Sequence, residues 1–137
     1  MNDAVLIRNE RETDYQKVEE ITRKAFWNLY IPGCVEHYLA HVMRGHADFL
    51  PELDFVVEIG GQVIGNIMYT KAKLIDECGE EKEILTFGPV SILPEYQRKG
   101  YGKRMMEYSF EVMISLTDTF SPSYSPSEYT TWLHLKH

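Results

Sequence analysis

Apolar residues in the first third of the chain follow one strand-like and two helix-like patterns. Residues 5–8 form a short apolar and β-branched run, which predicts a first strand. Apolar positions then recur every three or four residues through 18–26 and again through 35–43, which predicts two amphipathic helices. Pro32 and Gly33 interrupt the periodicity between these helices.

The middle of the chain contains several strand-like runs. Residues 55–59 and 63–69 flank the dipeptide Gly60-Gly61, which suits a tight turn with positive φ, so they predict a β-hairpin. Residues 84–92 predict the next strand. The polar and acidic stretch at 71–83 is expected to extend the preceding strand and then turn.

A third helix is expected from about Gly100 to Leu116. Its apolar positions cover more than one face, so we expect it to be deeply buried against a sheet. The predicted order of elements is β-α-α-β-β-β-α. This order predicts an α/β (α+β) fold with a mixed, mostly antiparallel central sheet flanked by helices.

The composition changes after the third helix. Eleven of the 17 residues from 115 to 131 are Ser, Thr or Pro. Pro122 and Pro126 would interrupt a helix or a central strand, so no core strand is expected in this stretch. We therefore divide the chain into a domain at 1–116 and an atypical Ser/Thr/Pro-rich segment at 117–137.

The overall composition suits one globular domain, with 137 residues, 44% hydrophobic and 26% charged. The net charge of −7 argues against nucleic acid as a partner, because an acidic surface repels phosphate backbones. The same charge would attract a cationic substrate such as a protonated amine, although it serves solubility equally well.

The two cysteines and the N-terminus bear on the compartment. Cys34 and Cys78 are far apart and form no Cys-x-x-Cys pair, so we expect reduced thiols in a cytoplasmic protein and no metal site. Residues 1–4 do not open a signal peptide, and no apolar run reaches the length of a membrane span. No membrane association is therefore expected.

The most informative segment is the strand, turn and loop at residues 84–105, whose loop reads Q-R-K-G-Y-G from 97 to 102. A helix start leaves backbone N–H groups unpaired and carries partial positive charge, and glycines let a ligand approach the backbone. Together with nearby cations, these features predict a site for a phosphate or diphosphate. The cations are Arg98, Lys99, Lys103 and Arg104.

The glycines alone would equally fit an ordinary connection between a strand and a helix, with solvated basic residues. The loop is not a Walker A loop, because it lacks the G-x-x-x-x-G-K-[ST] pattern. It also lacks the G-x-G-x-x-G dinucleotide fingerprint. These differences argue against nucleotide hydrolysis and hydride transfer.

The segment V-S-I-L-P-E-Y-Q-R-K-G-Y-G resembles the acetyl-CoA signature of the GNAT acyltransferase superfamily. The order of elements before it also matches that family, so the resemblance covers about residues 4–114. The matching residues of the signature are Val90, Ser91, Ile92, Pro94, Gln97, Gly100 and Gly102.

The resemblance implies an N-acetyltransferase that moves an acetyl group from acetyl-CoA, its cosubstrate, to a primary amine of a small molecule or peptide. Backbone groups of the strand would pair with the pantetheine arm, and the loop would hold the diphosphate. A local irregularity is expected beside them at Gly88-Pro89. The implied acetyl-CoA-binding residues are Val90, Ser91, Ile92, Gln97, Arg98, Lys99, Gly100, Tyr101, Gly102 and Lys103.

The sequence does not single out a catalytic base. Glu36, His37 and Glu83 are candidates, because they lie on a sheet strand or in the segment that shapes the acceptor site in the family. Each of them fits a solvated or structural role at least as well. Candidates for lining an acceptor pocket, which also suit simple packing, are Trp27, Tyr30 and Tyr38.

The C-terminal end departs from the family pattern, which continues with a fifth strand and a fourth helix. We expect residues 116–137 not to be equivalent to that part of the family. The sheet edge beside 84–92 would then be exposed, which favours a homodimer. The alternative function is a catalytically impaired GNAT-like domain that binds CoA or acts as an interaction module, and an unrelated phosphate-binding protein remains a third interpretation.

Overall fold

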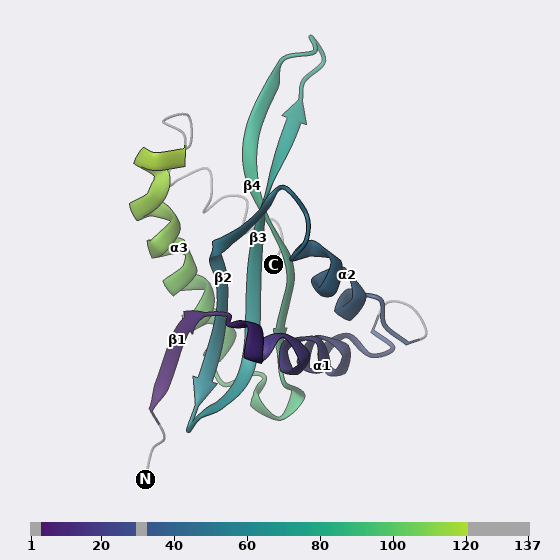
Figure 1. Ribbon diagram of the computed structural model, residues 1–137, viewed down its shortest axis with the longest axis vertical. Helices are drawn as coiled ribbons and strands as arrows, with labels where there is room; N and C mark the ends of the chain where they lie inside the picture. Colours follow the sequence, from purple (N-terminus) through teal and green to yellow (C-terminus); the bar gives the residue numbers. More distant parts are fainter. Residues whose placement is uncertain (1–3, 30–32, 121–137) are drawn as a thin grey trace.

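The computed structural model of the chain describes residues 4–29 and 33–120. Its four-stranded antiparallel sheet has the order β1-β2-β3-β4 and is flanked by three helices (Figure 1). The element order confirms the predicted β-α-α-β-β-β-α fold. The elements are β1 (Val5–Asn9), α1 (Tyr15–Phe26), α2 (Glu36–Met43), β2 (Phe49–Ile59), β3 (Gln62–Ile75), β4 (Glu81–Ile92) and α3 (Tyr101–Phe120), with short 3-10 helices at Glu12–Asp14 and Pro94–Tyr96.

The turn between β2 and β3 is the primed turn that the sequence predicts. Gly60 and Gly61 have φ values of 57° and 83°. A type I′ turn needs positive φ at both central positions, which glycine adopts at little cost. Ile59 pairs with Gln62 across the turn, so the hairpin is confirmed.

Side chains alternate between the two faces of the sheet, and each face packs against different helices. On one face, the hydroxyl oxygen of Ser91 in β4 lies 3.2 Å from that of Thr22 in α1. On the opposite face, the hydroxyl oxygen of Tyr69 in β3 lies 2.9 Å from that of Ser109 in α3. Helices α1 and α2 therefore cover one face and α3 covers the other, with buried apolar side chains on both sides.

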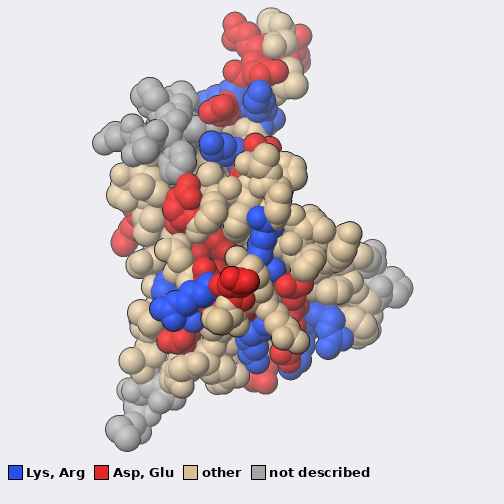
Figure 2. All heavy atoms as spheres, viewed as in Figure 1, with Lys and Arg blue, Asp and Glu red and all other residues tan. Residues whose placement is uncertain are grey.

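Strands β3 and β4 continue beyond the sheet as a two-stranded arm, in agreement with the expectation for residues 71–83 (Figure 1). The side chain of Asp76 closes the turn at the tip, where its Oδ1 accepts hydrogen bonds from the N–H groups of Cys78 and Glu80, both at 2.9 Å. Acidic side chains gather around this tip (Figure 2).

Strand β2 begins at Phe49, six residues before the expected start, and passes through Pro51. The pairing with β3 is irregular there, because Phe49 pairs with Thr70 while the next pair is Asp54 with Met68. Residues between these pairs bulge out of the hydrogen-bonded ladder. A proline is tolerated at such a position, since its missing N–H removes no ladder bond.

Helix α3 differs from the expectation in two respects. It runs to Phe120, four residues beyond the expected end at Leu116, because each Ser or Thr costs less than about 0.7 kcal/mol of helix propensity and does not stop a helix. Burial is confined to one face: Met105 and Met113 are buried, whereas Tyr108 is 38% exposed. A helix that covers the open face of a sheet buries only one stripe.

Helix α2 confirms the helix predicted within residues 35–43, but it keeps much of its apolar surface exposed. Ala40 and Met43 are buried, but Tyr38, Leu39 and Val42 are 65%, 46% and 42% exposed. The reason is its position, since α2 packs on α1 and on the edge strand β4 rather than across the sheet.

A buried polar network lies between β2 and the helices. The Arg44 guanidinium donates to both carboxylate oxygens of Glu10 and to Glu19, each at 2.8 Å. Asp54 of β2 is 3% exposed, accepts a 2.9 Å hydrogen bond from Asn66 Nδ2 and contacts the Glu10 side chain. Burial, with help from Glu10, raises the pKa of Asp54 to about 9. This carboxyl is therefore neutral at pH 7.

The Ser/Thr/Pro-rich segment beyond residue 120, and Tyr30 of the predicted pocket, lie outside the described residues. The division of the chain at residue 116 stays a prediction. Among the helices that the structure describes, none is long and apolar enough to cross a membrane. In the same part of the chain, no three His, Cys, Asp or Glu residues are grouped as a metal site requires, and Cys34 and Cys78 are free thiols.

Candidate active site

Strand β4 is the edge of the described sheet, and its backbone groups alternate between β3 and the outer side. The N–H of Leu93 donates to the carbonyl of Ile64 in β3 at 2.8 Å. Because backbone polar groups alternate along an antiparallel strand, Ser91 also faces β3. The backbone groups of Val90 and Ile92 therefore point outward, where no other described strand pairs with them.

A β-bulge interrupts β4 at Gly88-Pro89, the irregularity that the sequence predicts. Ile67 of β3 pairs with Val90, and the next pair joins Tyr69 with Phe87. Between these pairs Met68 of β3 lies opposite both Gly88 and Pro89, so β4 carries one extra residue. The bulge redirects the strand at the point where the outward-facing backbone begins.

The loop after β4 presents unpaired backbone N–H groups. Its backbone is left-handed at Arg98 and Gly100, with φ values of 62° and 88°. The first hydrogen bond of α3 runs from the N–H of Arg104 to the carbonyl of Gly100 at 3.1 Å. The preceding N–H groups of this first turn have no intrahelical acceptor. They lie next to β4, where Gln97 Nε2 donates to the carbonyl of Ile92 at 2.9 Å.

The loop cations are exposed, as an anion site requires. Arg98 and Lys99 lie on the surface, and Lys99 Nζ is 5.8 Å from the centre of the Tyr96 ring. Lys103 and Glu107 approach only to 3.9 Å, with both side chains largely in solvent. These charges therefore stay available to an anion beside the partial positive charge of the helix start.

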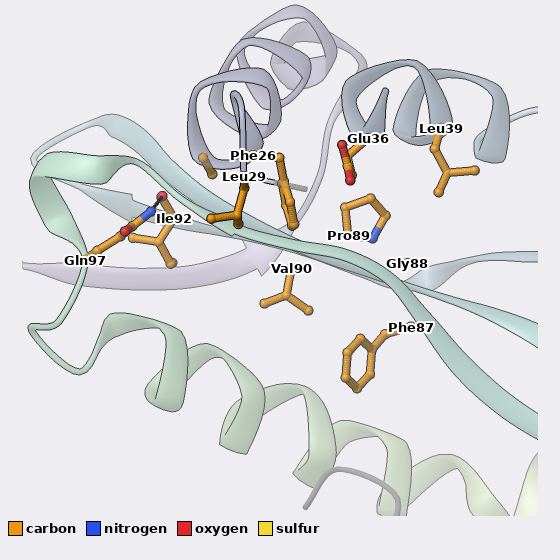
Figure 3. A pocket seen from close by; sticks show the side chains of 11 residues that line it. Phe26, Leu29, Glu36, Leu39, Phe87, Gly88, Pro89, Val90, Ile92 and Gln97 are labelled. Carbon is orange, nitrogen blue, oxygen red and sulfur yellow. Dashed lines mark hydrogen bonds between the residues drawn. The ribbon is translucent and has the colours of Figure 1, made fainter. Parts of the chain in front are cut away.

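A cavity of about 660 Å³ lies along the outer edge of β4, between that strand and helices α1 and α2 (Figure 3). It begins at the bulge and extends toward the loop, so it adjoins the outward-facing backbone. Its lining includes Phe26 and Leu29 from the α1 side, Glu36 and Leu39 of α2, Phe87, Gly88, Pro89, Val90 and Ile92 of β4, and Gln97.

Glu36 projects toward this cavity above Pro89 (Figure 3). Its Oε2 accepts hydrogen bonds from the N–H of Val35 at 3.1 Å and from the Cys34 thiol at 3.3 Å. The start of α2 therefore fixes the direction of the carboxylate. Sequence reasoning named Glu36 for its position on this helix, and the fold brings it to the cavity.

The other candidate residues lie elsewhere. His37 is half-buried on α2 and does not line the cavity, and its Nδ1 is enclosed without a hydrogen-bond partner among the described residues. Glu83 is exposed on the arm, opposite Lys73, and is not brought to the cavity. Trp27 and Tyr38 do not line it either.

Sequence reasoning missed the apolar wall of the cavity, which includes Phe26, Leu29 and Leu39. Phe26 and Leu39 were assigned only to the apolar faces of the two predicted helices, and Leu29 was not singled out. The available signal was the spacing of Phe26 and Leu29 just before Pro32-Gly33, which marks a helix end rather than a helix centre.

A family model, the acetyltransferase (GNAT) family, matches residues 18–121 of the chain. The chain belongs to this family. The match contains β4, the loop and α3, so the motif, the bulge and the cavity all lie within the GNAT domain. A search of curated proteins finds no match.

Several solved structures share the fold. A GNAT family acetyltransferase from Brucella melitensis, in complex with acetyl-CoA, is 28% identical with a TM-score of 0.68, over 87% of this chain and 72% of that chain. A GNAT family acetyltransferase from Staphylococcus aureus is 20% identical, with a TM-score of 0.56 over 85% and 81%. The ribosomal-protein-S18-alanine N-acetyltransferase of Escherichia coli is 17% identical, with a TM-score of 0.56 over 79% and 58%.

Proposed function

We propose that this chain is a cytoplasmic enzyme that binds acetyl-CoA and transfers the acetyl group to a primary amine. One observation carries the proposal: the outward-facing backbone of Val90 and Ile92 links the cavity to the unpaired amides at the start of α3. The acetyl-CoA in the Brucella structure supports acetyl-CoA as the cosubstrate.

The residues of this edge fit the chemical groups of acetyl-CoA. The diphosphate would accept hydrogen bonds from backbone N–H groups within residues 98–103. Gly100 leaves the approach open, because a Cβ there would meet no atom within 4 Å. The pantetheine amides would pair with the backbone of Val90 and Ile92 as an added strand. Ser91 faces β3, so its role would be to hold the strand on α1 through Thr22.

Glu36 is the proton acceptor that we propose in preference to His37 and Glu83, because it lines the cavity. An aliphatic amine has a pKa near ~10.4, so roughly one molecule in 10³ is neutral at pH 7. A positioned carboxylate can take this proton, directly or through water, as the amine becomes the nucleophile. The amine nitrogen then bonds to the thioester carbon, the C–S bond breaks, and a nitrogen proton becomes available to the leaving thiolate.

The carbonyl of the thioester gains negative charge as the amine attacks. Backbone N–H groups stabilise such a charge when they are aimed at it before the reaction begins. The outward N–H of Val90 is the donor that we propose, since Pro89 has no N–H and Val90 is the first outward-facing amide after the bulge.

Calorimetric titration tests the cosubstrate. Acetyl-CoA is expected to bind at least tenfold more tightly than S-acetylpantetheine, which lacks the diphosphate. Lys99→Glu should weaken acetyl-CoA several-fold. Lys73→Glu, an equal charge change on the exposed arm, should not. A folded chain that binds neither acetyl-CoA nor CoA would overturn the proposal.

Release of CoA thiol with a panel of primary amines then tests the reaction. Amine-dependent release is expected with the wild-type chain and a large loss of kcat with Glu36→Gln. Tight CoA binding without acetylation of any amine in the panel would favour the alternative, a GNAT-like domain that binds CoA without catalysis.

A further inference from the structure

Most of the side chains that line the cavity are apolar. Phe26, Leu29 and Leu39 form the helix side, and Pro89 of β4 faces them (Figure 3). The only polar side chains among the described lining residues are those of Glu36 and Gln97. The Gln97 amide already donates to the carbonyl of Ile92, so Glu36 is the single charged group in this part of the wall.

Only one of the two oxygens of the Glu36 carboxylate accepts hydrogen bonds from the described residues. Its Oε2 accepts two hydrogen bonds, from Val35 and Cys34, whereas Oε1 accepts none from the described residues. These two hydrogen bonds hold the carboxylate in one orientation beside the cavity, above Pro89 (Figure 3). This arrangement suits one cationic donor rather than several.

The apolar wall continues onto the surface beside Glu36. Leu29 is 58% exposed and Leu39 is 46% exposed, and both line the cavity. Removing such surface from water is favourable, so a ligand with an apolar body gains affinity by covering these side chains. The outward backbone groups of Val90 and Ile92 also line the cavity, but the pantetheine arm would occupy them. A ligand with further charges or hydroxyl groups would then lose hydration against side chains that offer no partner.

We infer that the amine acceptor is a primary amine with a single positive charge on an apolar aliphatic or aromatic body. This inference rests on the proposed acetyl transfer and narrows it. The ammonium group lies at Glu36 Oε1, and the body covers Leu29 and Leu39. Free arylalkylamines and peptides with an apolar N-terminal residue share this chemistry, whereas polyamines and aminosugars do not.

Acetylation rates across four amines test the inference. Phenethylamine and a Phe-initiated tripeptide amide represent the two sources of the proposed chemistry, and spermidine and glucosamine represent the excluded classes. The kcat/KM for at least one of the first two should exceed that for both others by tenfold or more, and the better one identifies the source. Equal rates, or a preference for spermidine or glucosamine, would overturn the inference.

Two variants of α2 test whether the apolar side chains of the cavity act on the amine rather than on the stability of the fold. Leu39→Asn should lower kcat/KM for the preferred amine at least fivefold and leave the Kd for acetyl-CoA unchanged. Val42→Asn is the matched control, because Val42 is 42% exposed on the same helix and does not line the cavity. An equal loss in both variants, or in neither, would refute the role of the wall.

Equilibrium binding keeps this inference distinct from the proposed function. Phenethylamine should perturb amide NMR signals of residues that line the cavity, and Glu36→Gln should weaken that binding without weakening 2-phenylethanol, its uncharged analogue. This measurement requires no acetyl-CoA and no turnover. If the chain binds phenethylamine but not acetyl-CoA, only the proposed acetyl transfer is refuted. If it binds acetyl-CoA but not the amine, only the proposed class of acceptor is refuted.

Discussion

Asp54 offers a quantitative test of the buried polar network. Its carboxyl is 3% exposed, and burial raises its pKa to about 9, with a side-chain hydrogen bond to Glu10 acting in the same direction. In the unfolded chain an aspartate has a pKa of about 3.9. Between pH values equal to these two pKa values, the folded state keeps a proton that the unfolded state has released. Stability from this group is fully present below about pH 4 and is lost as the pH rises through 9.

Asp54→Asn removes this proton uptake and keeps the shape of the side chain. The amide oxygen accepts from Asn66 Nδ2, now 2.9 Å from Asp54 Oδ1, and the amide nitrogen donates to Glu10. Each rise of one pH unit between the two pKa values lowers the free energy of unfolding of the wild type by about 1.4 kcal/mol. pH 7 lies about three units above the unfolded pKa, so at this pH the free energy of unfolding of the variant should exceed that of the wild type by up to about 4 kcal/mol.

Urea unfolding at pH 5, 6, 7 and 8 measures the effect. The advantage of the variant should grow with pH, by about 1.4 kcal/mol for each unit. Glu52→Gln is the control, since this exposed carboxyl on the same strand should change neither the free energy of unfolding nor its pH slope. A variant with the same pH slope as the wild type, or with lower stability at pH 7, would refute a neutral Asp54.

Three other substitutions test the packing of the sheet and the backbone of the loop. Gly65→Ala places a Cβ 2.9 Å from a backbone carbonyl of β4, so it should lower the free energy of urea unfolding by about 1–3 kcal/mol and weaken acetyl-CoA binding in calorimetry. Unchanged values of both quantities would contradict the close packing of β3 on β4. Gly100→Ala has free space for a Cβ but a φ of 88°, so backbone strain alone should lower its free energy of unfolding by about 1–2 kcal/mol. The control Gly45→Ala, whose Cβ would make an ordinary 3.8 Å contact, should lose no stability. Equal losses in both variants would exclude strain as the cause. Tyr69→Phe removes the 2.9 Å contact with Ser109 and should lower the thermal midpoint, at a cost of about 1 kcal/mol, and an unaltered midpoint would show that this pair adds no stability.

Local features of the fold followed from the sequence because their causes are local. The hairpin forms since Gly60 and Gly61 accept positive φ without a Cβ penalty. The loop at Gly100 was predicted for a related reason, since it combines a glycine with the start of a helix. The extra residue at Gly88-Pro89 followed from the missing proline N–H.

The burial of individual residues did not follow from periodicity. Residues 35–43 have the spacing of an amphipathic helix, yet α2 lies at the sheet edge and leaves Leu39 half exposed. Periodicity states which residues share a face, but not how much partner surface that face meets. The extension of α3 to Phe120 was missed because composition suggested an end that single-residue propensities do not enforce.

The sequence by itself determined the order of elements, the glycine turn, and the diphosphate-type loop with its GNAT resemblance, because each depends on residues close together in the chain. Only the tertiary structure decided that Glu36 meets the cavity while Glu83 lies on the arm. It also decided that Asp54, an ordinary acid in the sequence, stays neutral. Cavity walls and desolvation arise from residues distant in sequence, and no local pattern records how their surfaces meet.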